Sequence, residues 1–391
     1  MTRNLKTLWP IDDPNYFYLQ AIEEYGAGCH VKVNGRGEML MMGSYSYLGL
    51  NGHPRINQSA QAAIDRYGTG THGVRLLSGT LEVHRQLEAR IAAFKQVEAA
   101  LTFSSGYFAN FSTIACLVGR HDTVICDKLD HASIVDGCRL SQARFVRFHH
   151  NDMEHLERCI TSPEATGRKL VVVDAVFSMD GDIINLPEVS RLCRKHGAWL
   201  MVDEAHSIGV LGKTGHGIEE HFGLAPDCID IKMGTLSKTI PSVGGYIAGT
   251  RELCRYVSHE SRAFIYSAAL PPPAAAAALA AFDVIEDEPE RVARLHDNVA
   301  YFAARLTSAG LSFLDSTTAI FPIIFGEDYR AWDMGTYCQM HNVYIQAIPY
   351  PIVPKGTARL RAAVTAAHSH ADLDVCMAVI QDAIKHVVAR A

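Results

Sequence analysis

The 391-residue sequence lacks the patterns that mark several large protein classes. Its ten cysteines include no C-x-x-C pair and its 19 histidines include no H-E-x-x-H, so neither disulfides nor a metal site is expected. A formal net charge of −6 provides no basic surface for nucleic acid or for an anionic membrane. The longest apolar stretch, Ala274 to Phe282, is too short to span a membrane and predicts a packed helix.

Two further absences concern location and nucleotide chemistry. Residues 1–10 contain no apolar signal-peptide core, and several cysteines sit inside apolar runs, which together predict a cytoplasmic protein with buried free thiols. No G-x-x-x-x-G-K-[ST] motif is present, and no G-x-G-x-x-G follows the first strand. A P-loop nucleotide site and a dinucleotide-dependent dehydrogenase are therefore disfavoured.

Apolar segments of strand length alternate with segments of helix length through much of the chain. Continuous apolar runs at 169–173 and 198–202 are separated by a helical pattern at 187–196. Such runs predict a mainly parallel sheet with helices on both faces. A further helix is expected at the N-terminus, over residues 16–25.

Composition also predicts how the chain divides. The acidic segment 286–290 marks a boundary, after which helices and strands predict a smaller α+β region. The expected parts are an N-terminal arm with a loop (1–55), a large domain (56–285) and a small C-terminal domain (286–391).

Chemically active residues cluster just past the ends of the predicted strands. The most informative segment is Gly234-Thr-Leu-Ser-Lys238, which reads as a polar turn that delivers one lysine to the end of the apolar run 228–233. Because the carboxyl ends of parallel strands share one edge of a sheet, these residues are expected to converge. They are Ser104, Ser105, Gly106, Asp127, His131, Ser178, Asp203, His206, Thr235 and Lys238.

Together these residue types describe a site for pyridoxal phosphate, although each alone has an ordinary structural explanation. A desolvated Lys238 amine can form a Schiff base with an aldehyde, and Asp203 can keep a pyridine nitrogen protonated. The segment 105–107 opens a helix, whose free amides favour a phosphate. His206 suits the phenolic oxygen of the ring, and His131 suits its face.

The motifs resemble those of the α-oxoamine synthases, which are fold-type-I pyridoxal-phosphate enzymes with an aspartate-aminotransferase-like fold. The resemblance runs in order over roughly residues 40–370 and is closest to serine palmitoyltransferase. It is carried by Tyr47-Leu-Gly-Leu50, Asp130-His-Ala-Ser133, Val176-Phe-Ser-Met-Asp-Gly181, Val202-Asp-Glu-Ala-His-Ser-Ile-Gly209, Gly234-Thr-Leu-Ser-Lys238, Tyr266-Ser267 and Arg359-Leu-Arg361.

The resemblance implies roles for individual residues. Lys238 would carry the cofactor as an internal aldimine, Asp203 would pair with the pyridine nitrogen, and His206 and His131 would contact the ring. The cofactor's other contacts would come from Ser105, Gly106, Tyr107, Ser178 and Thr235, and from Ser267 of the second subunit of a homodimer.

Substrate contacts are also implied by the resemblance. Arg361 would grip the carboxylate of the amino acid, with Arg359 as a competing candidate. Tyr45 and Ser46 are assigned to substrate binding, although Tyr45 stands where several relatives have Asn. Other departures from the family pattern are Asp130 and the pair Ala268-Ala269.

The expected reaction is a decarboxylative Claisen-type condensation of a small L-amino acid with an acyl thioester, giving an α-aminoketone, CO₂ and a free thiol. Serine and a long-chain acyl-CoA are the favoured substrates, because the segment 42–47 resembles that of serine palmitoyltransferase. The alternatives are a short-chain enzyme that uses glycine or alanine, as in 2-amino-3-ketobutyrate CoA ligase or 8-amino-7-oxononanoate synthase, and a member that depends on acyl carrier protein. Two alternatives lie outside this reaction type. The chain could be a non-catalytic partner subunit, or a pyridoxal-phosphate enzyme that carries out transamination or retro-aldol chemistry.

Overall fold

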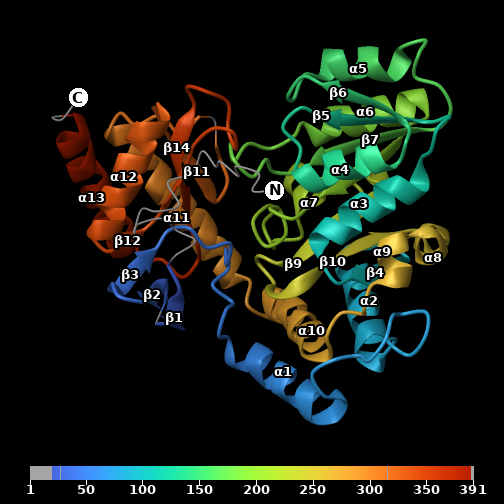
Figure 1. Cartoon of the computed structure of the whole chain (residues 1–391), viewed down its shortest axis with the longest axis horizontal. Helices are drawn as coiled ribbons and strands as arrows, with labels where there is room; N and C mark the ends of the chain where they lie inside the picture. Colours follow the sequence, from blue (N-terminus) through green and yellow to red (C-terminus); the bar gives the residue numbers. More distant parts are fainter. Residues whose placement is uncertain (1–19, 27, 315, 389–391) are drawn as a thin grey trace, which may run out of the picture. The chain divides into compact units, whose positions relative to one another are not determined.

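The computed structural model describes residues 20–26, 28–314 and 316–388, which form two compact units (Figure 1). The large unit comprises Tyr45–His296 with Thr317–Ala319. The small unit comprises the described residues up to Ser44, then Asp297–Ser316 and the described residues from Ile320 onward. The predicted division instead separated residues 1–55 from 286–391, whereas here the described residues up to Ser44 share a unit with the C-terminal part.

A seven-stranded sheet forms the centre of the large unit. Its order is β4-β10-β9-β8-β7-β5-β6, and only β10 runs antiparallel to its two neighbours. The predicted mainly parallel sheet is therefore confirmed. The strands are β4 (Ala99–Phe103), β5 (Thr123–Asp127), β6 (Arg144–Phe148), β7 (Lys169–Asp174), β8 (Trp199–Asp203), β9 (Ile231–Ser237) and β10 (Pro241–Gly249).

Helices enclose this sheet. All residues of β7 and β8 except the first of each are buried, as expected for parallel strands covered on both faces. The helices are α1 (Pro54–Tyr67), α2 (Glu82–Phe94), α3 (Gly106–Leu117), α4 (Ala132–Leu140), α5 (Met153–Thr161), α6 (Leu186–His196), α7 (Ile218–Phe222), α8 (Arg251–Glu260), α9 (Arg262–Tyr266) and α10 (Pro272–Asp287), with a 3₁₀ turn at Pro226–Cys228.

The small unit contains two small sheets with its own apolar core. One has the order β1-β2-β3-β12 and the other β11-β14-β13. The core includes Phe302, Phe321 and Leu360, all fully buried. The elements are β1 (Ile22–Tyr25), β2 (His30–Val33), β3 (Gly37–Met41), β11 (Ile320–Gly326), β12 (Val343–Tyr344), β13 (Gln346–Ile348), β14 (Ala358–Ala363), α12 (Asp328–Met340), α13 (His370–Val388) and α11 (Glu290–Ser308), which crosses the boundary at residue 297.

Two local predictions were wrong. Residues 22–25 of the expected N-terminal helix form β1, because they pair with β2, while residues 16–19 lie outside the described residues. The segment 234–237 is not a turn but continues β9, since it pairs with β10. Gly234 is needed there, because a Cβ atom would come within 2.3 Å of Cζ of Tyr246. Lys238 is thus the first residue after the strand.

All ten cysteines lie in the described part of the chain and are free thiols, and eight of them are buried, as predicted. Among residues 20–26, 28–314 and 316–388, no helix has the length and apolar character that crossing a membrane requires.

Candidate functional site

A cavity of about 290 Å³ lies where β7, β8 and β9 end. Most of the residues that were expected to converge do so here, because the parallel strands deliver them to one edge. Tyr45, Ser46, Ser267 and Arg361 are not part of its lining. The cavity is lined by Ser105, Gly106, Tyr107, Asn110, His131, Ser133, Asp174, Ser178, Asp203, Ala205, His206, Met233, Thr235, Ser237 and Lys238.

Asp203, the last residue of β8, is held by two hydrogen bonds although it is only 4% exposed. Its Oδ2 accepts from Asn110 Nδ2 at 2.6 Å, and its Oδ1 accepts from the backbone N–H of Ala205 at 2.8 Å. Asn110 Nδ2 also donates to the Ser133 hydroxyl, while the buried Asn110 Oδ1 has no hydrogen-bond partner. The carboxylate is therefore oriented from α3 and from its own loop.

His131 caps the N-terminus of α4 and faces the same cavity. Its Nδ1 accepts from the backbone N–H of Ser133 at 3.2 Å, which leaves the hydrogen of the neutral ring on Nε2. Its own backbone N–H donates to Asp174 Oδ2 at 2.9 Å. Partial burial lowers the pKa of His131 below its usual value; Asp203 opposes this shift and the Lys238 amine adds to it. A neutral imidazole is the result near pH 7.

His206 and Lys238 come from the loops after β8 and β9. The hydrogen bond between the Tyr47 hydroxyl and His206 Nδ1, 2.7 Å long, orients the imidazole. The ring of Tyr45 meets His206 edge to face at 5.7 Å between centroids. Lys238 Nζ lies over the same Tyr45 ring, 5.7 Å from its centroid. Tyr45 thus contacts two residues of the cavity without being part of its lining.

The N-terminus of α3 closes another side of the cavity. Ser105 caps this 12-residue helix, with its hydroxyl accepting from the backbone N–H of Phe108 at 3.2 Å. A Cβ atom on Gly106 would lie 2.8 Å from Thr235 Oγ1, so only glycine allows this close approach. Thr235 Oγ1 itself donates to the Gly244 carbonyl at 3.1 Å. Free amides at a helix N-terminus provide a site for an anion such as phosphate.

This donor set fits pyridoxal phosphate. It contains an amine for the aldehyde, a buried carboxylate for the pyridine nitrogen, two imidazoles for the ring and a helix N-terminus for the phosphate. The glycine at position 106 lets α3 begin directly against Thr235, which brings the helix N-terminus next to the end of β9.

The remaining predicted residues lie elsewhere. Ser267 contacts Ser104 of its own chain, with 3.3 Å between the hydroxyl oxygens. Arg359 and Arg361 are buried on the same face of β14 in the small unit. The assignment of Arg361 rather than Arg359 to the substrate carboxylate stays a prediction, as do the roles of Ser46 and Ser267.

Six lining residues were not among those named from the sequence: Asn110, Ser133, Asp174, Ala205, Met233 and Ser237. Asp174 ends β7 as Asp203 ends β8, so the rule that selected Asp203 also selects Asp174. Ser133 stands within the quoted segment 130–133, and Asn110 follows Gly106 by one helical turn, which places both on one face of α3.

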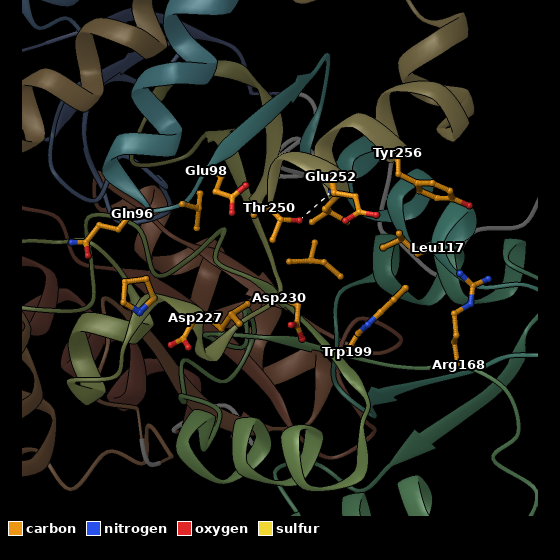
Figure 2. A pocket seen from close by; sticks show the side chains of 16 residues that line it. Gln96, Glu98, Leu117, Arg168, Trp199, Asp227, Asp230, Thr250, Glu252 and Tyr256 are labelled. Atoms are coloured by element: carbon orange, nitrogen blue, oxygen red, sulfur yellow. Dashed lines mark hydrogen bonds between the residues drawn. The ribbon is translucent and has the colours of Figure 1, made fainter.

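A larger hollow of about 590 Å³ lies at the opposite edge of the sheet, where β8 begins at Trp199 and β9 begins at Ile231 (Figure 2). Trp199 and Tyr256 stand among four acidic side chains there. Among the described residues that line it there is neither lysine nor histidine, so the amine chemistry belongs to the smaller cavity. The acidic residues are Glu98, Asp227, Asp230 and Glu252.

Comparison with known proteins adds independent information. The family model for aminotransferase class I and II matches residues 37–380. The 8-amino-7-oxononanoate synthase of Symbiobacterium thermophilum is 45% identical over 347 residues, 88% of this chain and of that protein. The enzyme of the same name from Geobacter sulfurreducens is 46% identical over 356 residues, 90% of each. The solved serine palmitoyltransferase of S. paucimobilis with a pyridoxal phosphate–myriocin aldimine has a TM-score of 0.91 at 31% identity, covering 95% of this chain and 94% of that one.

Proposed function

The chain belongs to the aminotransferase class I and II family and, within it, to the α-oxoamine synthases, and we propose that it condenses alanine with a seven-carbon dicarboxylic acyl thioester. It is a pyridoxal-phosphate-dependent acyltransferase. The observation that carries the substrate proposal is the 45% and 46% identity to two 8-amino-7-oxononanoate synthases over nearly the whole chain.

The product named by these relatives defines its own precursors. In 8-amino-7-oxononanoate, the amino-bearing carbon and the terminal methyl correspond to alanine without its carboxylate. The other seven carbons, ketone included, correspond to a heptanedioyl group. A carbon–carbon bond forms between the alanine Cα and the thioester carbonyl, the carbon–sulfur bond breaks, and CO₂ and the thiol leave.

Serine with a long-chain acyl group, the reading expected from residues 42–47, is the less favoured candidate. The fold similarity to serine palmitoyltransferase is high, with a TM-score of 0.91, but the identity is 31%. That similarity supports the shared reaction type. The higher identities support the short-chain alternative.

The proposed cofactor contacts follow from the cavity. Lys238 Nζ would hold the aldehyde carbon, the Asp203 carboxylate would hold the pyridine nitrogen, and His206 would donate to the phenolic oxygen, since all three residues line the cavity. When bound, pyridoxal phosphate supplies an electron sink for charge that develops at the Cα of the amino acid. The phosphate would be held by Ser105, Thr235 and the amides of Gly106 and Tyr107, and Ser178 would lie near the ring oxygen.

The remaining roles concern the substrate. Lys238 Nζ would accept the proton from Cα, and the neutral His131 ring would pack on the cofactor and so orient the bond to be broken. Arg361 binds the carboxylate with two parallel hydrogen bonds, a geometry that guanidinium favours. Tyr45 and Ser46 contact the substrate in this scheme.

The proposal includes a homodimer in which Ser267 reaches the phosphate of the other subunit. Large apolar side chains exposed on the large unit support an association surface: Leu76 is 69% exposed, Leu77 81% and Tyr266 72%. Sedimentation equilibrium should give twice the chain mass of 42.9 kDa. A monomer with full activity would contradict this part of the proposal.

The deciding experiment is a substrate panel scored by thiol release and by product mass. Alanine with heptanedioyl thioesters, on coenzyme A and on acyl carrier protein, is compared with serine plus palmitoyl-CoA and glycine plus acetyl-CoA. We expect the first pairing to have the highest kcat/KM, by about 100-fold or more. A preference for serine and palmitoyl-CoA would replace the proposal with the sphingoid-type reading, and no thiol release from any pair would favour a non-catalytic subunit.

A further inference from the structure

Four charged side chains lie buried in the large unit outside the lining of the Lys238 cavity. They are Lys95, which follows α2; Glu204, which follows Asp203; Glu219 in α7; and Lys232 in β9. Their side chains are 2%, 0%, 8% and 0% exposed, respectively. We refer to them as the buried quartet.

Three ion pairs link the two lysines and the two glutamates of the quartet in a row. Lys95 Nζ lies 2.8 Å from Glu204 Oε2 and 2.8 Å from Glu219 Oε2. Lys232 Nζ pairs with Glu219 Oε1 and donates to the Pro226 carbonyl at 2.7 Å. The Lys232 amine also donates to the Lys95 carbonyl at 3.2 Å. Glu219 thus pairs with both lysines and Glu204 with Lys95, and all four side chains are buried.

Stability alone does not explain such an arrangement. Transferring charges from water into a protein interior is costly, and apolar side chains of similar volume often stabilise a fold equally well. Burial lowers the pKa of Lys95, but Glu204 and Glu219 outweigh it, so the net pKa is raised and the amine stays charged. What the quartet provides is directional contacts between segments that are far apart in sequence.

Those contacts converge on the segment that carries Asp203. The backbone N–H of Glu204 donates to the Met233 carbonyl at 2.8 Å, which joins the end of β8 to β9. Glu204 Oε1 accepts from the Ser207 hydroxyl at 3.2 Å and from the Ile218 N–H at 3.3 Å. Gly217, at φ +105°, passes so close that a Cβ would lie 2.2 Å from Glu204 Oε1. The loop between Asp203 and α7 is therefore folded around this carboxylate.

We propose that the buried quartet is a positioning network: it holds the end of β8, and with it Asp203 and His206, at a set distance and orientation from the end of β9 and Lys238. Lys232 is the second residue of β9, and Lys238 directly follows the end of the same strand, six residues later. The inference rests on the proposed cofactor site, and the four residues act through Asp203, His206 and Lys238 rather than touching the cofactor.

The test is Glu204→Gln in the full-length holoenzyme, which keeps the shape of the side chain and removes its charge. Visible circular dichroism per bound pyridoxal phosphate reports how the cofactor is placed, and titration of the apoenzyme gives the Kd. We expect the dichroism to change, the Kd to rise about tenfold or more, and kcat to fall more than KM changes, because misplacement affects the reacting geometry.

The matched control is Glu88→Gln, which removes a carboxylate from the buried pair with Arg75, a pair with side chains 8% and 7% exposed that does not line the cavity. A purely structural role predicts that both variants lower Tm alike and leave dichroism, Kd and kcat unchanged. That result would overturn the proposal.

A double variant, Lys95→Met with Glu204→Gln, covers the case in which the single variant does not fold. It removes one charge of each sign and so avoids an unpaired buried ion. A folded double variant with altered dichroism supports the network, whereas one with the original dichroism and Kd overturns it. Failure of the unmodified protein to bind pyridoxal phosphate would instead remove the proposed function, and the network with it.

Discussion

The Asp203 carboxylate depends on an amide that lies on another element. Asn110 donates to it across 2.6 Å from the first turns of α3, so α3 contributes to both ends of the proposed cofactor site. Because the carboxylate is buried, losing this donor leaves part of its charge uncompensated. Hydrogen bonds to buried charged groups are worth about 1.5–3 kcal/mol.

Asn110→Ala should therefore lower kcat/KM roughly tenfold to 100-fold, the equivalent of that energy. The measurement is steady-state thiol release with saturating pyridoxal phosphate. Ser112→Ala is the control, since Ser112 is buried on the same helix but bonds to Ser261. Equal losses in the two variants would show that the effect comes from α3 stability and not from Asp203.

Lys238 offers a direct chemical test. Borohydride reduction of the holoenzyme should attach the cofactor permanently to the peptide that contains Lys238, because this is the one lysine that lines the cavity within the described part of the chain. Lys238→Ala should abolish the attachment and reduce kcat by several orders of magnitude. Lys213→Ala, which changes an exposed lysine, should leave both unchanged. A reduced adduct on any other lysine would refute the assignment.

Helix α3 shows how one element combines stability and binding. Its start is capped by Ser105, and its first residue is a glycine pressed against Thr235. The cap satisfies one N–H and leaves others for a ligand, which is why the same helix terminus can be both well folded and anion-binding.

Gly106→Ala separates these two properties. The added methyl would meet Thr235 Oγ1 at 2.8 Å and should shift the helix terminus, so the Kd for pyridoxal phosphate should rise about tenfold or more while Tm changes little. Gly119→Ala is the control, since a Cβ there meets nothing within 4 Å. An unchanged Kd in Gly106→Ala would indicate that the phosphate does not sit at this helix terminus.

The stability of the small unit should depend on pH through His368. Both ring nitrogens are used: Nδ1 accepts from the Thr365 N–H at 3.0 Å, and Nε2 lies 3.2 Å from the Met41 carbonyl. Burial lowers the pKa of His368 to about 4. The folded imidazole therefore stays neutral at pH values where the unfolded one is already charged.

Between pH 6.5 and 4 the unfolded chain binds a proton that the folded chain does not, so the free energy of unfolding falls as pH falls through this window, by up to about 3 kcal/mol. Above pH 6.5 this contribution is constant. Urea unfolding at pH 7.5 and pH 5 measures the difference, which should shrink in His368→Gln and persist in the exposed variant His341→Gln. Equal pH dependence in both variants would contradict the assignment.

A structural feature could be predicted from the sequence when the pattern that indicates it lies within one short segment. Asp203 and Lys238 were expected at one place because a parallel sheet brings the carboxyl ends of its strands to one edge. A residue at the end of such a strand therefore has a predictable position in the fold. Asn110 was missed because it lies inside a helix. The β1 segment was misread because its pairing partner, rather than its own composition, makes it a strand.

Local pattern alone was enough for the mainly parallel sheet, the reactive residues at one edge of it and the family, since these depend on periodicity and on short motifs. Only the folded chain decides the partners of Asp203 and His206, the closeness of Gly106 to Thr235 and the buried quartet. Each of these contacts joins residues that are distant in sequence. Such contacts depend on how the whole chain packs, and the sequence of a single segment does not specify them.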